Sequence, residues 1–296
     1  LFLHPKIAII TNLDADHLSA YENDFSNLQR SFKQFIAQVD DDGLIIICID
    51  HPVLREMMPD IKQRLITYGF DNEADIKISH YVQNGLSSEF LVTTKAWQRL
   101  VALNLPGQHN ALNALPSLAV AEYLGALDID NLGALSIFPG VKRRLQRHAN
   151  TELNNAGIMV FEDYGHHPEE IAVTIRALRQ AWSDKRLVMV FQPHRYSRTS
   201  DLFEDFVTVL AQVDTLILLE VYDAGEALDV NATSDKLAAA IARDSLSDPL
   251  HVKDNGSLMA ILQKNLRSND VVVFQGAGCV GRHANHLCEQ SHFMIQ

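Results

Sequence analysis

Cysteine is scarce in this 296-residue chain: Cys48, Cys279 and Cys288 are odd in number and lack the spacing of metal ligands. No disulfide framework is therefore expected, and a reducing, cytoplasmic environment is the simplest interpretation. No apolar run approaches the roughly 20 residues that span a bilayer, and no signal peptide is expected at the beginning of the chain. These absences argue against a membrane partner.

Positive charge is also in short supply. The chain has 25 lysines and arginines against 37 aspartates and glutamates, which gives a formal net charge of −12. A general nucleic-acid binder needs a basic surface to meet the phosphates, so nucleic acid is not an expected partner. Small phosphorylated ligands are not excluded, because a few local arginines can bind them within an acidic protein.

The middle of the chain has the pattern of a βαβ unit. Residues 158–161 and Leu187–Phe191 are short apolar runs typical of buried parallel strands, and apolar residues recur at helical spacing between them. Polar clusters follow both runs, at 163–168 and at 192–199. Because ligands bind at the carboxyl ends of the strands in open α/β sheets, we expect both clusters to lie at one ligand-binding edge.

Two adjacent histidines, His166 and His167, precede Pro168 and two glutamates, an order typical of a first helical turn. Backbone N–H groups at a helix amino terminus favour a phosphate or a carboxylate. A pair of capping histidines explains the same pattern, so both interpretations stay open.

Arg195 and Arg198 are three residues apart, close enough to converge on one anion if the segment turns or begins a helix before Asp201. Two guanidinium groups form a clamp for a carboxylate or a phosphate, and each charge-assisted hydrogen bond is worth about 1.5–3 kcal/mol. A surface ion pair would explain one arginine, but it explains less well why His194 and Tyr196 crowd the same strand end. We therefore expect an anion site here.

The predicted strand Ile7–Ile10 ends in a loop that carries Asn12, Asp14, Asp16 and His17. Carboxylate, amide and imidazole groups can hold a divalent cation. Capping and turn chemistry is the commoner reason for such a loop, so the residues alone leave both interpretations open.

The remaining pattern alternates strands and helices, which predicts the α/β class. We expect a first domain in residues 1–148 and a Rossmann-like parallel sheet in residues 149–296, because a polar, glycine-bearing stretch follows residue 149. The basic run at 142–147 is interpreted as a solvated charge run.

A further helix is expected to begin near Asn110 and Asn113. Their side-chain amides can pair with a base edge, or they can simply cap the helix and form a polar turn. Pro116 lacks an N–H group, so we expect a kink at this residue or a later start of the helix.

Near the end of the chain, the residues 276–281 read GAGCVG and formally match the dinucleotide fingerprint GxGxxG. Only 15 residues follow, too few for the second strand that carries the ribose-binding acid about 20 residues on. A tight strand-to-helix turn is therefore the better interpretation than nicotinamide or flavin binding.

Seven motifs occur in order along the chain: TNLDADHL, PGQHNALN, GVKRRLQ, DYGHHPEE, FQPHRYSRT, EVYDAGE and QGAGCVG. Together they resemble the Mur ligase family over essentially the whole chain. FQPHRYSRT is most similar to the members that add alanine, whereas the double-histidine segment is shared with the members that recycle murein tripeptide.

This resemblance implies an ATP-dependent ligase that joins the carboxylate of UDP-N-acetylmuramate to L-alanine in peptidoglycan biosynthesis. ATP would phosphorylate the carboxylate, and the amine of alanine would attack the acyl phosphate, since phosphate is a good leaving group. Mg²⁺ and cationic side chains would offset the charge that develops during transfer.

The resemblance also implies roles for single residues on the nucleotide side. His17 would be a magnesium ligand, Asn110 and Asn113 would contact the adenine, and Arg144 would reach the ATP phosphates. Two further residues would lie near the ribose or the closing domain interface: Asp163 and Tyr164.

On the amino-acid side, the resemblance places the L-alanine carboxylate at His194, Arg195 and Arg198. His166 and His167 would line the same site and, with Arg144, form the catalytic set.

The chain also departs from the family's pattern. The phosphate-binding loop GxxGK[ST] and the domain that holds the UDP group are not found in these residues, and Leu145 stands where an aromatic residue is usual. Without the backbone amides and lysine of that loop, triphosphate binding should be severely weakened. We therefore expect an inactive C-terminal part of the ligase. A non-catalytic binding module derived from the family and the tripeptide-recycling ligase are the alternatives.

Overall fold

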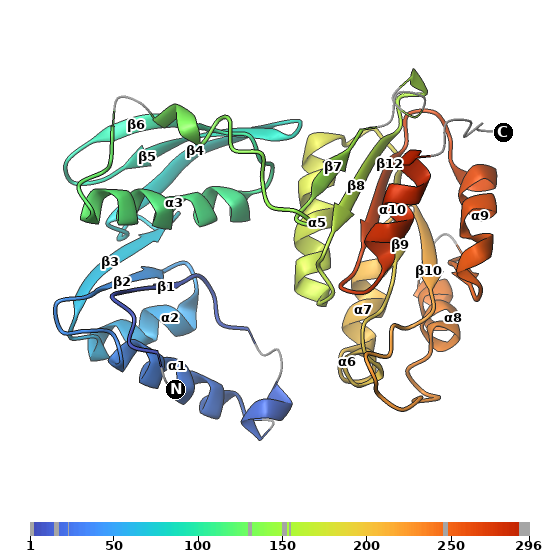
Figure 1. The fold of residues 1–296 in the computed structure, drawn as a ribbon, viewed down its shortest axis with the longest axis horizontal. Helices are drawn as coiled ribbons and strands as arrows, with labels where there is room; N and C mark the ends of the chain where they lie inside the picture. The colour runs from blue at the N-terminus through green and yellow to red at the C-terminus, as the bar shows by residue number, and fades with distance from the viewer. Residues whose placement is uncertain are drawn as a thin grey trace. The chain divides into compact units, whose positions relative to one another are not determined.

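The computed structural model describes residues 3–14, 18–22, 24–129, 132–149, 153, 155–244 and 248–289. It divides into two compact units, Leu1–Pro139 and Gly140–Gln296, and each contains one six-stranded sheet (Figure 1). The predicted α/β class is confirmed. Within the described ranges, no helix is long and apolar enough to cross a membrane.

The sheet of the N-terminal unit follows the order of the chain. Parallel pairing joins the first four strands, and the last three form antiparallel pairs. The strands are β1 (Ile7–Ile10), β2 (Leu44–Cys48), β3 (Arg64–Gly69), β4 (Ile76–Asn84), β5 (Ser87–Thr93) and β6 (Gln98–Leu103).

Helices cover both faces of this sheet. The described helices are α1 (Phe25–Ala37), α2 (Pro52–Met57) and α3 (Gln108–Tyr123), with 3-10 turns at η1 (Leu18–Tyr21), η2 (Met58–Asp60) and η3 (Leu132–Ala134). Alternate residues of β2 point to opposite faces. Ile45 and Ile47 pack in the core with α1 and α2, whereas Leu44 and Ile46 pack in the core with α3.

Helix α3 begins at Gln108 and continues past Pro116, so the later start suggested by that proline is wrong. Pro116 is buried and has no N–H group for the carbonyl four residues before it. Burial of Ala111, Leu115 and Ala119 on the same helix stabilises it in spite of the missing hydrogen bond.

The C-terminal sheet has the order β11-β10-β9-β12-β8-β7. All neighbours pair in parallel except β7, which is antiparallel to β8. The strands are β7 (Gln146–His148), β8 (Met159–Asp163), β9 (Leu187–Phe191), β10 (Thr215–Leu219), β11 (Leu250–Val252) and β12 (Val271–Gln275). The pairing of β7 with β8 joins residues 146–148 to this sheet. The units accordingly divide after Pro139, before the expected boundary at 148/149.

Two layers of helices enclose the C-terminal sheet. Val188 and Val190 pack in the core with α9 and α10, while Phe191 on the opposite face contacts Phe206 of α7, with ring centroids 5.7 Å apart. The helices with described bounds are α5 (Pro168–Ala181), α6 (Tyr196–Asp201), α7 (Phe203–Leu210), α8 (Ser234–Asp244), α9 (Leu258–Asn265) and α10 (Val280–Glu289), with a 3-10 turn η4 (Asn255–Ser257).

The two strands of the predicted βαβ unit are not neighbours, because β12 lies between β8 and β9 (Figure 1). Both strands nevertheless pair in parallel with β12, so their polar clusters lie at the same edge of the sheet. The end of β12 is thereby placed between the two clusters. Helix α6 begins at Tyr196, so the segment after β9 does enter a helix before Asp201.

Candidate functional site

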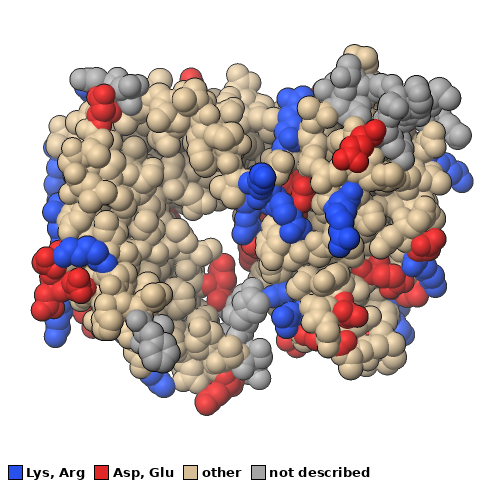
Figure 2. All heavy atoms as spheres, viewed as in Figure 1, with Lys and Arg blue, Asp and Glu red and all other residues tan. Residues whose placement is uncertain are grey.

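Polar side chains converge at the carboxyl ends of β8, β12, β9 and β10, all within the C-terminal unit. Parallel strands bring their carboxyl ends to one edge, where the loops that follow them and the first turns of the next helices meet. Basic and acidic side chains are both visible on the surface of this unit in Figure 2.

Asp163, the last residue of β8, is a buried connection between three segments. Its side chain is almost inaccessible, and its Oδ1 accepts hydrogen bonds from Gly165 N at 2.7 Å and from Gln275 Nε2 at 2.9 Å. Its Oδ2 accepts one from Leu145 N at 2.7 Å. Burial raises the pKa of Asp163, whereas these donors act in the opposite direction. The carboxylate therefore shapes the loops around it.

Tyr164 follows Asp163 and lies against two arginines. The guanidinium carbons of Arg143 and Arg144 are 4.7 Å and 5.6 Å from the centroid of its ring, within the range of cation–π contacts. Arg144 Nη1 is 3.3 Å from Glu170 Oε1, and its side chain is about half exposed. Arg144 is thus accessible at the edge where a phosphate ligand is expected.

Arg143 is a residue that sequence reasoning missed. Its φ of 61° lies in the left-handed region, its Nε donates to Glu162 Oε1 at 2.8 Å, and its Nη2 donates to the carbonyls of Gly276 and Gly278 at 2.9 and 3.2 Å. The interpretation of residues 142–147 as a solvated charge run is therefore wrong for Arg143. The only sequence signal was its place in that run, which did not distinguish it from its neighbours.

The two adjacent histidines have different surroundings: His167 caps a helix, and His166 lies among the aromatic rings at the edge of the sheet. His167 is the N-cap of α5: its Nδ1 accepts from Glu169 N at 3.3 Å, and Glu170 Oε2 accepts from His167 N at 3.2 Å. The capping interpretation is thus confirmed for His167. The ring of His166 instead lies between those of Tyr164 and His194, with centroids 5.3 Å and 5.7 Å away.

The residues of the predicted anion clamp lie on one short segment. Arg195 is the N-cap of α6, and Arg198 lies within the helix, 7% exposed, with its Nη1 donating to His194 O at 3.3 Å. Burial, followed by the nearby His166 and the two arginines, lowers the pKa of His194 to about 4. His194 is therefore a neutral imidazole at neutral pH, and the positive charge of this segment resides on the arginines.

The loop after β10 supports this segment and was not assigned a role from the sequence. Tyr222 N donates to Pro193 O and Arg195 N donates to Tyr222 O, both at 2.8 Å. The Tyr222 ring stacks on His194 with centroids 5.3 Å apart. Glu226 accepts hydrogen bonds from Ser197 N and Oγ at 3.0 and 2.7 Å. The motif EVYDAGE was the only signal for this loop.

The GAGCVG segment is the turn from β12 into α10, as expected, and packing explains its glycines. Gly276 has a φ of 142°, and a Cβ there would lie 2.7 Å from Gln192 O. At Gly278 it would lie 2.5 Å from Gln192 Oε1, and at Gly281 it would overlap Glu162 Oε1. These glycines make room for Gln192 and Glu162 within the protein, a role that requires no dinucleotide.

The residues expected to serve adenine and magnesium belong to the N-terminal unit. Asn110 Nδ2 donates to Pro106 O at 2.7 Å, and Asn113 is exposed one turn further along α3. Asn12 Nδ2 donates to Asp14 Oδ2 at 3.2 Å after β1, but His17 lies outside the described residues. No group of three or more possible metal ligands occurs in the part of the chain that the structure describes.

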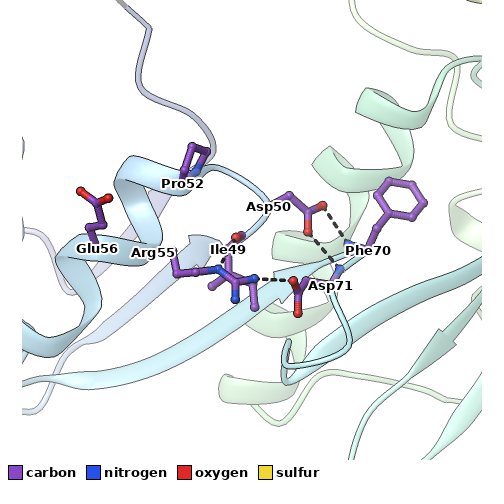
Figure 3. Close-up of a pocket in the computed structure, with 7 residues that line it drawn as sticks. All are labelled: Ile49, Asp50, Pro52, Arg55, Glu56, Phe70 and Asp71. Carbon is purple, nitrogen blue, oxygen red and sulfur yellow. Dashed lines mark hydrogen bonds and ion pairs between the residues drawn. The ribbon is translucent and has the colours of Figure 1, made fainter.

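The N-terminal unit also has an open depression of about 550 Å³ at the carboxyl ends of β2 and β3 (Figure 3). Three of its charged side chains are bound within the protein: Asp50 accepts from Phe70 N at 2.8 Å and Asp71 N at 3.0 Å, and Arg55 Nη2 lies 2.5 Å from Asp71 Oδ2. This network ties the two strand ends together.

Two family models match the chain. The model described as "Mur ligase middle domain" matches residues 1–121, and the model described as "Mur ligase, glutamate ligase domain" matches residues 143–278. The two matches follow each other along the chain and together cover most of it.

Solved structures of similar fold include the UDP-N-acetylmuramate–alanine ligase of Thermotoga maritima, with 24% sequence identity and a TM-score of 0.77. This match covers 97% of the present chain and 60% of the Thermotoga chain. The MurF ligase of Thermotoga maritima in complex with ADP has 17% identity and a TM-score of 0.73, and the match covers 96% of the present chain and 62% of the MurF chain. A murein peptide ligase of Psychrobacter arcticus has 21% identity and a TM-score of 0.63, and the match covers 96% of the present chain and 57% of the Psychrobacter chain. The chain thus spans about 60% of the length of the structures that it matches, and these identities show a shared fold.

Proposed function

Because the chain belongs to the Mur ligase family, we propose that it is part of an ATP-dependent ligase that joins L-alanine to the carboxylate of UDP-N-acetylmuramate in peptidoglycan synthesis. The observation that carries this proposal is the convergence of His194, Arg195 and Arg198 with His166 at one edge of the C-terminal sheet. A small amino acid presents a carboxylate and an amine, and this edge offers two guanidinium groups for the carboxylate.

In this proposal, Arg195 and Arg198 bind the carboxylate of alanine and leave its amine directed away from the clamp. The neutral His194 adds no charge that would oppose binding of the cationic amine. Holding the amine beside the acyl phosphate replaces a bimolecular encounter with a unimolecular step. The ammonium of alanine first loses a proton to solvent, and the free amine then attacks the acyl carbon. The C–O bond to the phosphate breaks and a second proton leaves the nitrogen, so the products are the amide and phosphate, with ADP from the earlier phosphorylation.

The nucleotide side uses Arg144, which is accessible beside Tyr164, to offset negative charge on the transferred phosphate. Asn110 and Asn113, on α3 of the N-terminal unit, would contact the adenine. Asp163 holds Leu145 N and thereby the loop of Arg144, so we assign it a positioning role instead of a ribose contact.

Magnesium, when bound, would neutralise phosphate charge, and His17 would be one of its ligands. The described residues do not include a complete ligand set, so no step here depends on the metal. The chain contains no GxxGK[ST] sequence, and we expect no ATPase activity from it alone.

Phosphate release from ATP in the presence of UDP-N-acetylmuramate tests the proposal, on this chain and on a version extended upstream. Release that requires L-alanine in the extended protein is the expected result. Release that requires the murein tripeptide instead would assign the recycling reaction. No release from either version, with L-alanine still bound, would indicate a non-catalytic binding module.

A further inference from the structure

The carboxylate of Glu226 contacts the segment that carries the clamp. Glu226 Oε1 accepts a hydrogen bond from Ser197 Oγ at 2.7 Å, and Oε2 accepts one from Ser197 N at 3.0 Å. Glu226 Oε1 also lies 3.4 Å from Arg195 Nη1. One carboxylate from the loop after β10 thus contacts both the first turn of α6 and the guanidinium just before it.

The backbone of Arg195 needs such support. Its φ of 74° lies in the left-handed region, which residues other than glycine rarely adopt. The N–H of Arg195 donates to Tyr222 O at 2.8 Å, so the same loop that supplies Glu226 also holds this strained residue. The loop therefore determines both where the Arg195 side chain starts and the direction in which it extends.

The guanidinium of Arg195 can bind a second carboxylate without releasing Glu226. Arginine has five N–H donors in a planar fork, and Glu226 approaches only Nη1, at a distance longer than a strong charge-assisted hydrogen bond. About half of the Arg195 side chain is exposed. The shorter bonds of Glu226 go to Ser197, so the helix turn is its main anchor, and the Nε and Nη2 edge of Arg195 remains for a ligand.

Glu226 is ionised at neutral pH. Partial burial acts to raise its pKa, but the hydrogen bonds from Ser197 and the charge of Arg195 outweigh burial and lower the pKa below its ordinary value. It therefore provides a fixed negative charge beside Arg195 throughout the range in which an amino acid carries its carboxylate.

We propose that Glu226 is a positioning residue for the amino-acid substrate: it fixes the first turn of α6 and directs the fork of Arg195 toward the substrate carboxylate. This inference rests on the proposed function and deepens it. Loss of the Glu226 carboxylate lets Arg195 sample other rotamers. L-alanine binding then weakens on the order of fivefold, the size expected for a half-exposed ion pair.

Labelling of arginine by phenylglyoxal, followed by mass spectrometry, reports on Arg195 in the whole chain. We expect Glu226→Gln to raise the labelling rate of Arg195 several-fold and to raise the L-alanine concentration needed for protection about fivefold. Glu226→Asp should restore part of the wild-type behaviour. L-alaninamide, which has no carboxylate, should protect neither protein.

Asp223→Asn is the matched control. Asp223 lies in the same loop and its replacement removes the same charge, but its Oδ1 accepts from Gly225 N, at 3.0 Å, within the loop. In Asp223→Asn, the labelling rate of Arg195 and its protection by L-alanine should equal those of the wild type. A change as large as that in Glu226→Gln would indicate general loosening of the loop and overturn the inference.

The remaining outcomes separate this inference from the proposed function. If L-alanine protects Arg195 in the wild type, and both the labelling rate and the protection are unchanged in Glu226→Gln, the inference alone is overturned. Protection of Arg195 at a lower L-alanine concentration in Glu226→Gln than in the wild type would also overturn it, because Glu226 would then compete with the substrate. If L-alanine fails to protect wild-type Arg195, the amino-acid site of the proposed function fails as well.

Discussion

Gly281→Ala sets two physical effects of opposite sign against each other. Gly281 is the second residue of α10, where alanine is the better helix former by up to about 1 kcal/mol. A Cβ at this position would overlap Glu162 Oε1 and lie 2.6 Å from its Cδ. Propensity alone predicts a more stable protein, whereas sterics predict a less stable one.

The structure indicates that sterics win. Glu162 is 5% exposed and cannot move without weakening its 2.8 Å bond to Arg143 and its 3.2 Å contact with His148 Nε2. Overpacking costs about 1–3 kcal/mol, and disruption of a buried ion pair costs about 3–5 kcal/mol. Because Arg143 is one-third exposed, disruption of its ion pair with Glu162 costs less than for a fully buried pair. We therefore expect the free energy of unfolding to fall by about 2–4 kcal/mol.

Chemical denaturation of the wild type and of Gly281→Ala measures this difference. In a double-mutant cycle, the loss should nearly vanish in the background of Glu162→Ala, because the methyl group then has room. A Gly281→Ala protein as stable as the wild type, or more stable, would refute the packing explanation of the glycine motif.

Three further predictions concern the site itself. Asp163→Asn places an amide N–H₂ against backbone donors and should lower the free energy of unfolding by about 1–3 kcal/mol in denaturant melts; a change no larger than that of Asp254→Asn, at an exposed turn, would contradict its connecting role. Arg195→Gly should be about 1 kcal/mol more stable than Arg195→Ala because of the left-handed φ, although both should bind L-alanine more weakly than the wild type; equal stabilities would argue against backbone strain. The pKa of His194 is lowered to about 4, so the folded state binds this proton less readily than the unfolded chain, and stability should fall as the pH drops from about 6.5 to about 4. Melts at a series of pH values should show a shallower fall for His194→Gln in that window, and an unchanged slope would count against the assignment.

The sequence predicted the local elements of the fold well, because each depends on a short pattern. Apolar runs marked β2, β9 and β12, and Pro168 with its two glutamates marked the first turn of α5. The position of β12 between β8 and β9 was not predicted. Hydrophobic periodicity shows that a strand is buried, but it does not say which strands are its neighbours.

Site residues divide in a similar way. The spacing of Arg195 and Arg198 suggested that they act together, and the structure places both at helix α6; their role as an anion clamp stays a prediction. Arg143 and Glu226 were missed because their partners lie far away in the sequence: Arg143 bonds to Gly276 and Glu226 bonds to Ser197. Only the folded chain brings such pairs together.

The measurement that tests the central account most directly is binding of ¹³C-labelled L-alanine to the chain by NMR, with L-alaninamide as the comparison. Arg198 is the buried member of the clamp, and a clamp built from Arg195 and Arg198 predicts that L-alanine binds, that L-alaninamide does not, and that Arg198→Ala abolishes the difference. Equal binding of both compounds, or full binding by a folded Arg198→Ala protein, would contradict the assignment of this edge as the site for an amino-acid carboxylate.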